Sequence, residues 1–388
     1  MGRLSFRRRA ATRLSGLGRA GVRLPAKRLF ARCGLVALAM LAPAIGSAAG
    51  RPAGCGRALP SGTYRMADQD VERTYRVLVP THYSPRTAYP LVMVFHGWGG
   101  DENEFLNDEG VVSLARKRGY IVVAPRGLGS AGADANRNSW SFRGSTTGLA
   151  GNGEDDLASA PTPGSTCDVA GTRNYTYPSC SGIARNTCSW TQCQADDVAF
   201  TIALLAEVES RLCVDTTRVF ATGGSNGGMF TWELGQDARS APNFRAIAPI
   251  IGLPHRGHLD RPGRSGGLPV LVITGLEDTT VPPGGWEDAS HTTTRDGDRY
   301  YYTGAAAMTR RWGAVNGCPY VDAPAQSFGA GTRRADCRTY CASDPTGWST
   351  GQAGAGWPNV LDCRAPMGHT YDLGWSWKLV LDFFDAQR

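Results

Sequence analysis

The stretch Gly223-Gly224-Ser225-Asn226-Gly227-Gly228 restricts what this chain can fold into more than any other feature. An apolar run, residues 218–221, leads into it, and residues 229–234 have the composition of a helix. A Gly-x-Ser-x-Gly turn between a strand and a helix is typical of a nucleophile elbow. Such a turn is strained, and glycines without a Cβ let neighbouring backbone approach it closely. We therefore expect Ser225 to be a nucleophile; a Gly/Ser-rich surface loop is the alternative in a chain with 50 glycines.

Apolar segments on both sides of this turn predict strands, and helical spacing lies between them. The predicted strands are residues 75–79, 91–95, 120–124, 246–251 and 270–274. The predicted helices are residues 104–118, 198–212 and 377–384. Fully apolar runs that alternate with helices are typical of a parallel sheet. We expect one α/β catalytic domain, residues 50–388, with a mostly parallel central sheet and helices on both faces. Asp196 is expected to cap the second helix and Asp197 to complement its positive end, both as structural residues.

Residues 128–195 interrupt this pattern. They are rich in Gly, Ser, Thr and Asn, contain four cysteines and show little periodicity. A loop of this length is uncommon in a compact domain unless it is stapled or functional. We expect a disulfide-pinned insertion over the carboxyl edge of the sheet, either as part of a substrate wall or as a surface decoration.

The first 49 residues have the pattern of an export signal. They contain ten basic residues and no acidic one, so that the formal net charge of +7 becomes −3 without them. A short apolar stretch, residues 33–45, precedes the small residues 46–49, as in a cleaved signal peptide; an anchor helix is the alternative. We expect a secreted protein, extracellular or periplasmic, that has no membrane contact after cleavage. Because the basic charge belongs to this leader, we expect no nucleic-acid partner.

The cysteine count fits an oxidising compartment. Loss of Cys33 with the leader leaves ten cysteines, at positions 55, 167, 180, 188, 193, 213, 318, 337, 341 and 363. This even number predicts up to five disulfides, with the pairing open. No histidine or Cys-x-x-Cys pair lies near them at the spacing of zinc ligands, so we expect no metal and no cofactor.

A serine nucleophile needs a base and an acid that orients the base. His369 lies far downstream, just before the terminal helix, and Asp278 follows the strand at 270–274. The order serine, acid, histidine is that of α/β-hydrolases. Other residues could serve instead: for the base His255, His258 or His291, and for the acid Glu277.

The oxyanion hole needs two backbone donors aimed at the developing negative charge. The amide of Asn226 supplies one, because this residue follows the nucleophile. The loop at Gly97 and Trp98, which ends an early strand as His-Gly-Gly-type loops do, is expected to supply the other. His96 is expected to be structural.

Several of these motifs together resemble one family. They are Gly54-Cys55-Gly56, Ser61-Gly62-Thr63-Tyr64, His96-Gly97-Trp98-Gly99-Gly100, Asp196-Asp197-Val198, Leu212-Cys213-Val214-Asp215, the segment 275–282 with Asp278, and Gly368-His369-Thr370-Tyr371. The chain resembles secreted feruloyl esterases and poly(3-hydroxybutyrate) depolymerase-like hydrolases of carbohydrate esterase family 1. The resemblance covers most of residues 53–388. It implies an α/β-hydrolase fold, a triad of Ser225, Asp278 and His369, no metal, and extracellular ester hydrolysis. The insertion 128–195 and the cysteine-rich tract 318–363 depart from the family pattern.

Aromatic residues in the loops near the predicted site are candidates for an acyl-binding wall. They are Trp98, Trp140 and Tyr371, with ordinary core packing as the alternative. For Trp190, core packing is the expected role. The function expected is a monomeric serine esterase acting on hydroxycinnamoyl esters of plant cell-wall polysaccharide. A polyhydroxybutyrate depolymerase and an acetyl xylan esterase are the alternatives of the same class. A non-catalytic extracellular binding protein is the alternative of another class, and a peptidase is less favoured because nothing marks an amide-specific pocket.

Overall fold

The computed structural model describes most of the chain that follows the predicted leader. The described residues are 52–129, 137–149, 151, 164–172, 175, 177–180, 188–193, 196–284, 298–318, 325–331, 333–339 and 358–387, and they belong to one compact unit within Gly50–Arg388. The predicted signal peptide and His291 lie outside them, and the signal peptide stays a prediction. Among these residues, no helix is long and apolar enough to cross a membrane.

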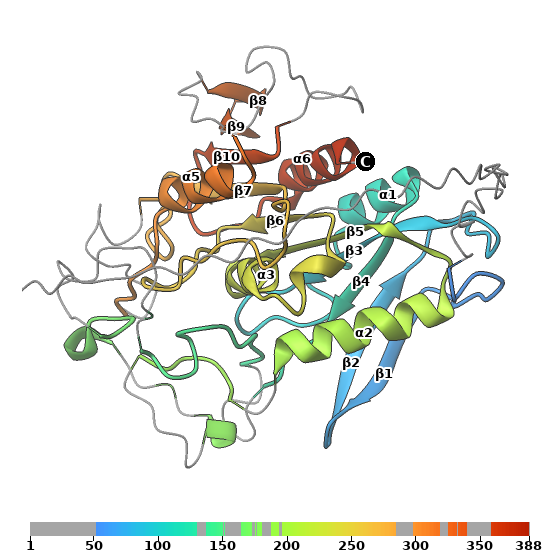
Figure 1. Cartoon of the computed structure of the whole chain (residues 1–388), viewed down its shortest axis with the longest axis horizontal. Coiled ribbons are helices and arrows are strands. Elements are labelled where there is room, and N and C mark those ends of the chain that lie inside the picture. The colour runs from blue at the N-terminus through green and yellow to red at the C-terminus, as the bar shows by residue number, and fades with distance from the viewer. Residues whose placement is uncertain are drawn as a thin grey trace, which may run out of the picture. The chain divides into compact units, whose positions relative to one another are not determined.

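A single ten-stranded sheet forms the centre of this unit (Figure 1). Its order is β1-β2-β4-β3-β5-β6-β7-β10-β9-β8. In that order the strands are β1 (Gly62–Asp68), β2 (Val71–Leu78), β4 (Ile121–Pro125), β3 (Tyr89–Phe95), β5 (Val214–Gly224), β6 (Ala246–Ile250), β7 (Val270–Gly275), β10 (Val360–Ala365), β9 (Arg333–Thr339) and β8 (Gln326–Ala330). The strands from β4 to β10 pair in parallel, whereas those at both ends of the sheet pair antiparallel. The carboxyl ends of the parallel strands therefore meet at one edge.

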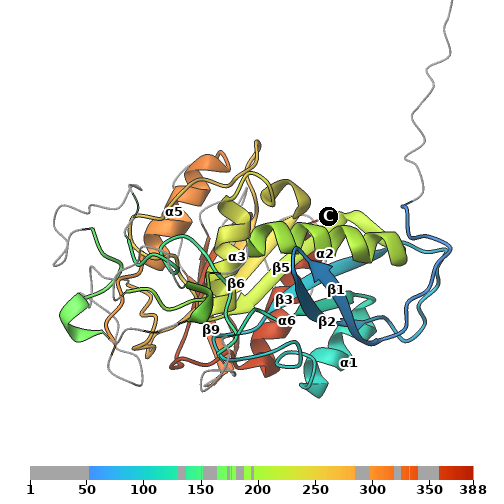
Figure 2. The same cartoon turned by 90° about the horizontal axis from the view of Figure 1, so that it is seen from below.

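Helices cover both faces of the sheet (Figures 1 and 2). On one face lie α1 (Glu109–Arg118) and α6 (Leu373–Ala386), which contact each other. On the other lie α2 (Asp197–Arg211), α3 (Asn226–Gln236) and α5 (Ala305–Val315). Short 3₁₀ turns occur at Val169–Gly171, Pro178–Cys180 and Ala241–Asn243. The predicted α/β class, with a mostly parallel sheet and helices on both faces, is confirmed.

Capping residues explain where the helices begin. Asp196 accepts a hydrogen bond from the Ala199 N–H, so its predicted role as the N-cap of α2 is confirmed. Helix α1 begins later than its spacing predicts, because Asp108 caps it through the Val111 N–H. It ends at Gly119, whose φ of 74° favours glycine.

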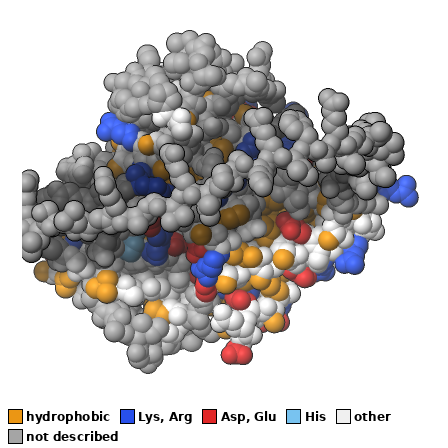
Figure 3. All heavy atoms as spheres, in the orientation of Figure 1, with side chains coloured by type: hydrophobic (Ala, Val, Ile, Leu, Met, Phe, Trp, Pro, Cys, Tyr) orange, Lys and Arg blue, Asp and Glu red, His pale blue; other side chains and the backbone are white. Residues whose placement is uncertain are grey.

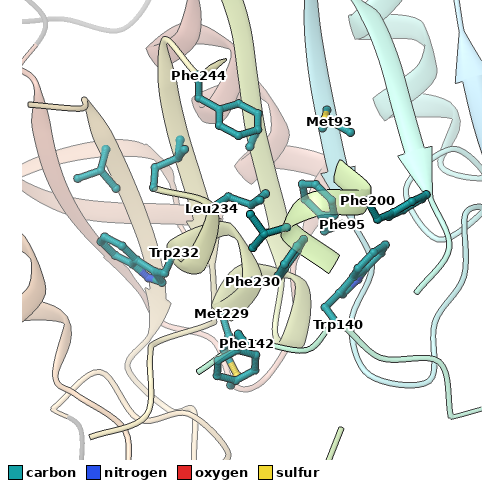
Figure 4. Close-up of a cluster of buried hydrophobic side chains, with 14 of the residues drawn as sticks. Met93, Phe95, Trp140, Phe142, Phe200, Met229, Phe230, Trp232, Leu234 and Phe244 are labelled. Carbon is teal, nitrogen blue, oxygen red and sulfur yellow. The ribbon is translucent and has the colours of Figure 1, made fainter. Parts of the chain in front are cut away.

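The insertion contributes to the core between β3 and α3. Figure 4 shows Trp140 beside Phe95 and Phe230. Its ring stacks on Phe230 at a centroid distance of 5.3 Å and meets Phe95 edge-on at 5.2 Å. Trp140 is fully buried. Removing such a side chain typically costs about 3–5 kcal/mol, so this part of the insertion belongs to the folded domain.

Buried polar contacts attach the insertion to the sheet and to α2. The carboxylate of Asp197 accepts hydrogen bonds from the Ser141 N–H at 2.7 Å and the Gln192 amide at 3.1 Å, and forms an ion pair with Arg73 of β2 at 2.9 Å. Both charged side chains are fully buried. Burial raises the pKa of Asp197, and the neighbouring Arg73 lowers it. The Asp197 side chain thus joins three parts of the chain, beyond its predicted role at the helix end.

Four disulfides are present among the described residues. They are Cys55–Cys213, Cys167–Cys188, Cys180–Cys193 and Cys337–Cys363. Cys318 is also disulfide-bonded. Two of the four bridges lie wholly inside residues 128–195, so the predicted disulfide-pinned insertion is confirmed. Persisting disulfides indicate an oxidising compartment.

The surface carries charges of both signs. On the face shown in Figure 3, Lys and Arg side chains are interspersed with Asp and Glu over the described residues. Hydrophobic side chains lie between them. No single sign of charge dominates this part of the described surface.

Candidate active site

Ser225 sits on the sharp turn between β5 and α3. Its φ of 53° and ψ of −118° are strained for a residue with a side chain. Its N–H donates to the Ile250 carbonyl at 2.9 Å, and its own carbonyl accepts from the Met229 N–H at 2.9 Å. A Cβ added to Gly227 would lie within 3.0 Å of the Phe95 carbonyl oxygen, closer than real Cβ atoms come. The predicted elbow is therefore a tight turn pressed against β3.

Three predicted residues meet at the carboxyl edge of the sheet. His369 Nε2 lies 2.8 Å from Ser225 Oγ, and His369 Nδ1 lies 2.8 Å from Asp278 Oδ2. Asp278 follows β7 and is buried, and its other oxygen accepts from the N–H groups of Thr280 and Val281, each at 2.8 Å. Backbone donors thus fix the carboxylate while it faces the imidazole. The arrangement can take a proton from the serine hydroxyl and stabilise the resulting imidazolium.

The alternative bases and the alternative acid lie elsewhere. His255 is fully buried, accepts a hydrogen bond from the Trp190 indole at 2.9 Å, and has a pKa lowered to about 3 by burial. His258 Nε2 is hydrogen-bonded to the Leu149 carbonyl at 3.1 Å. Glu277 is exposed and its backbone bonds to Met367. Among the described residues, His369 is the base that contacts Ser225, and Asp278 is the acid that contacts His369.

His96 is structural, as expected. Its Nε2 accepts from the Gly127 N–H at 2.8 Å, so its proton is on Nδ1 and is donated to the Gly97 carbonyl at 2.6 Å. Burial lowers the pKa of His96 to about 4. The ring is therefore neutral near pH 7 and holds the loop that follows β3.

The oxyanion-hole prediction needs one correction. The Gly97 N–H donates to Glu104 Oε1 at 2.9 Å, so it is not free to bind an oxyanion. Within the described part of the chain, no acceptor engages the Trp98 N–H. Asn226 is the first residue of α3, where N–H groups have no intrahelical acceptor. Trp98 and Asn226 thus keep backbone N–H groups that no acceptor among the described residues engages.

The Asn226 side chain has a second role that the sequence did not reveal. It is fully buried, accepts from the Trp140 N–H at 2.7 Å and donates to the Trp140 carbonyl at 3.0 Å. The residue after the nucleophile thus binds the insertion through both ends of its amide. An asparagine in a Gly/Ser-rich turn carries no signal for such a distant partner.

Of the three predicted substrate-binding aromatics, Trp140 is placed differently. Trp140 is fully buried behind the elbow, so its prediction as a substrate-facing ring is wrong. The Tyr371 hydroxyl faces the Gly224 carbonyl at 3.4 Å and its ring stacks on Phe105 at 5.7 Å, so it supports the turn from beneath. Tyr371 is partly exposed, so its predicted role in the wall stays a prediction.

Trp98 stays a candidate because it is partly exposed. Its indole N–H donates to the Tyr177 hydroxyl at 2.8 Å, and its ring meets Tyr175 edge-on at 5.5 Å. Both tyrosines belong to the insertion and are buried. No sequence pattern marks these two tyrosines, because the insertion shows little periodicity. Trp190 is buried, as expected.

Sequence comparison finds relatives that are named feruloyl esterase C. The Aspergillus flavus protein named Probable feruloyl esterase C is 24% identical over 283 residues, covering 70% of this chain and 72% of that protein. Feruloyl esterase C of Emericella nidulans is 35% identical over 96 residues, covering 24% and 33%. The chain is an ester hydrolase homologous to feruloyl esterases. No protein-family model matches this sequence.

The fold of the esterase is that of α/β-hydrolases, with a serine on the turn after a central parallel strand. Among solved structures, the acetyl xylan esterase from Aspergillus awamori is similar with a TM-score of 0.44 and 13% sequence identity. That match covers 82% of this chain and 99% of the other.

Proposed function

We propose that this esterase is a secreted, monomeric serine hydrolase that cleaves carboxylic esters through Ser225, His369 and Asp278. The observation that carries the proposal is the continuous hydrogen-bonded series from Asp278 to His369 to Ser225, with 2.8 Å at each step. Nucleophile, base and orienting acid are then in contact before a substrate arrives.

The reaction follows from these positions. Ser225 Oγ attacks the ester carbonyl carbon while His369 Nε2 takes the hydroxyl proton. The N–H groups of Trp98 and Asn226 donate to the oxygen on which negative charge develops. His369 then gives its proton to the leaving alcohol, and an acyl-enzyme remains. A water molecule, deprotonated by His369, attacks the acyl carbon; the bond to Ser225 Oγ breaks, His369 returns the proton to this oxygen, and the acid is released.

A hydroxycinnamoyl ester of plant cell-wall polysaccharide is the proposed substrate. The relatives named feruloyl esterase C support it. The partly exposed Trp98 ring also supports it, because it lies on the residue that offers an oxyanion donor and could stack on a phenolic acyl group. Polyhydroxybutyrate and acetylated xylan are the alternative substrates. Secretion is supported by the disulfides and by the leader pattern of residues 1–49.

Hydrolysis of three substrates tests both the proposed serine mechanism and the proposed substrate class. Wild type, Ser225→Ala and the control Ser113→Ala, an exposed serine of α1, are assayed on methyl ferulate, p-nitrophenyl acetate and a polyhydroxybutyrate film. We expect methyl ferulate to have the highest kcat/KM, and Ser225→Ala to lose about 10⁴–10⁶-fold in kcat while the control is unchanged. Turnover of the film alone would move the function to a depolymerase. No Ser225-dependent turnover on any substrate would support the binding protein.

A further inference from the structure

We propose that Glu104 and Tyr371 are a positioning pair that holds the loop carrying the Trp98 oxyanion donor against the loop carrying His369. The inference rests on the proposed function. Glu104 lies in the turn between β3 and α1, and Tyr371 lies two residues after His369. The two side chains come from opposite ends of the chain and meet at Gly97: Glu104 accepts its N–H at 2.9 Å, and a Cβ on Gly97 would lie within 3.0 Å of the Tyr371 hydroxyl oxygen.

Glu104 and Tyr371 meet at Gly97. One oxygen of the Glu104 carboxylate accepts the Gly97 N–H at 2.9 Å, and Tyr371 packs against the same glycine. Burial raises the pKa of Glu104, while the hydrogen bond from Gly97 lowers it. Gly97 is thus the point at which the two side chains act together.

This pair sets the direction of the Trp98 N–H. The Gly97 residue is held at its N–H by Glu104, and at its carbonyl by the His96 ring at 2.6 Å and the Gly100 N–H at 3.1 Å. That carbonyl and the Trp98 N–H belong to one peptide group. Because a trans peptide is planar, its N–H points opposite to its carbonyl. Fixing Gly97 from both sides thus directs the Trp98 N–H toward the space left for the oxyanion.

Glycines surround the pair because no larger residue fits. A Cβ on Gly97 would lie within 3.0 Å of the Tyr371 hydroxyl oxygen, and one on Gly224 within 3.0 Å of the Tyr371 ring. A Cβ on Gly100 would lie within 3.0 Å of Glu104 Oε2. Moving either side chain aside would break its hydrogen bonds. Glu104 and Tyr371 thus account for glycines in both the early loop and the elbow.

Tyr371 completes the link to the nucleophile. Its ring lies between Phe105 and the elbow, and its hydroxyl is 3.4 Å from the Gly224 carbonyl. Gly224 is adjacent to Ser225, and His369 lies two residues before Tyr371. The loop with Gly97 and Trp98, the turn at Ser225 and the loop with His369 are therefore held together at Tyr371. This fits a requirement that catalytic groups keep their relative positions closely.

Three variants test the pair on p-nitrophenyl acetate. Glu104→Ala removes the acceptor of the Gly97 N–H, and Tyr371→Phe removes only the hydroxyl. Glu104→Gln keeps an acceptor for the Gly97 N–H. Because loss of an oxyanion donor costs about 10²–10³ in kcat, we expect a loss of about 10- to 100-fold in Glu104→Ala and about 10-fold in Tyr371→Phe, with KM changed by less than about threefold. Glu104→Gln should recover most of the loss.

The controls separate this proposal from the proposed function. Glu109→Ala replaces an exposed acid of α1 and should behave as wild type. Circular dichroism and the active-site concentration, titrated with a phosphonate, correct kcat for any unfolded fraction. Activity of Tyr371→Phe and Glu104→Ala within twofold of wild type would overturn the pair, as would a rise in KM at constant kcat. If wild type and Ser225→Ala were equally inactive, the proposed function would fail first, and the phosphonate labelling rates would still compare the variants.

Discussion

The turn at Ser225 and the insertion 128–195 are stabilised in opposite ways. The turn depends on contacts between backbones, which only glycine allows: a Cβ at Gly227 would meet the carbonyl of β3. The insertion depends on side chains far apart in sequence, such as Asn226 with Trp140 and Asp197 with Ser141, and on its own disulfides. The comparison teaches that a close backbone contact leaves a local sequence signature, whereas a side-chain network does not. It also predicts that the two regions respond differently to the same kind of mutation.

The largest difference is expected from added methyl groups. In Gly227→Ala the new Cβ would collide with the backbone of β3, so Ser225 must shift. Because small displacements of catalytic groups strongly reduce the rate, we expect kcat to fall at least about 100-fold. Gly164 in the insertion has open space around the same position, and its φ is 79°. Gly164→Ala should therefore cost about 1–2 kcal/mol of stability and leave kcat unchanged. Steady-state kinetics of both variants make the test. Equal activity in the two would remove the distinction between the regions.

The disulfides give the next largest difference. Cys55–Cys213 joins positions 158 residues apart, and Cys180–Cys193 joins positions 13 apart. The chain-entropy relation predicts that replacing the first pair by serines costs about 5 kcal/mol and the second about 3 kcal/mol. Urea unfolding of the two double variants measures this. A larger cost for the short bridge would mean that strain or residual structure in the insertion decides its stability.

The smallest effect is the contribution of His255 to the pH dependence of the free energy of unfolding. This histidine lies in the part of the domain covered by the insertion. Burial lowers its pKa to about 3, against about 6.5 in an unfolded chain. Below pH 6.5 the unfolded chain binds a proton that the folded protein does not. The free energy of unfolding therefore decreases by about 1.4 kcal/mol for each unit by which the pH is lowered. His255→Gln should reduce the slope between pH 5.5 and pH 4 by about that amount.

The exposed His82 provides the control for this slope. His82→Gln should leave the slope unchanged. An unchanged slope in His255→Gln would show that this imidazole is protonated in the folded protein. Denaturant unfolding at a series of pH values measures all three proteins.

The sequence predicted the parts of the site that depend on strand ends. Ser225 and Asp278 each follow a strand whose apolar pattern is local, and His369 precedes a helix with such a pattern; the geometry brings the three together. Strand β10 was not predicted, because Asp362 and Arg364 interrupt its apolar run. Helix α5 was not predicted either, because it is rich in alanine and arginine and has few large apolar residues.

The sequence could not resolve which residues of the loops face the site. Trp140 and Trp98 have similar settings in sequence, yet one is fully buried and the other partly exposed. Gly97 and Trp98 were equal candidates for the oxyanion donor until Glu104 was seen to hold the Gly97 N–H. Each distinction depends on a partner distant in sequence or on the direction of one peptide group, and neither leaves a periodic pattern.

Covalent trapping tests the central claim, that Ser225 is the nucleophile, most directly. Wild type and Ser225→Ala are treated with a p-nitrophenyl phosphonate, digested with trypsin and analysed by mass spectrometry. The account predicts one adduct, on the peptide 219–239 that contains Ser225, in proportion to the loss of esterase activity, and no adduct in the variant. An adduct on another peptide, or full inhibition without an adduct on Ser225, would contradict it.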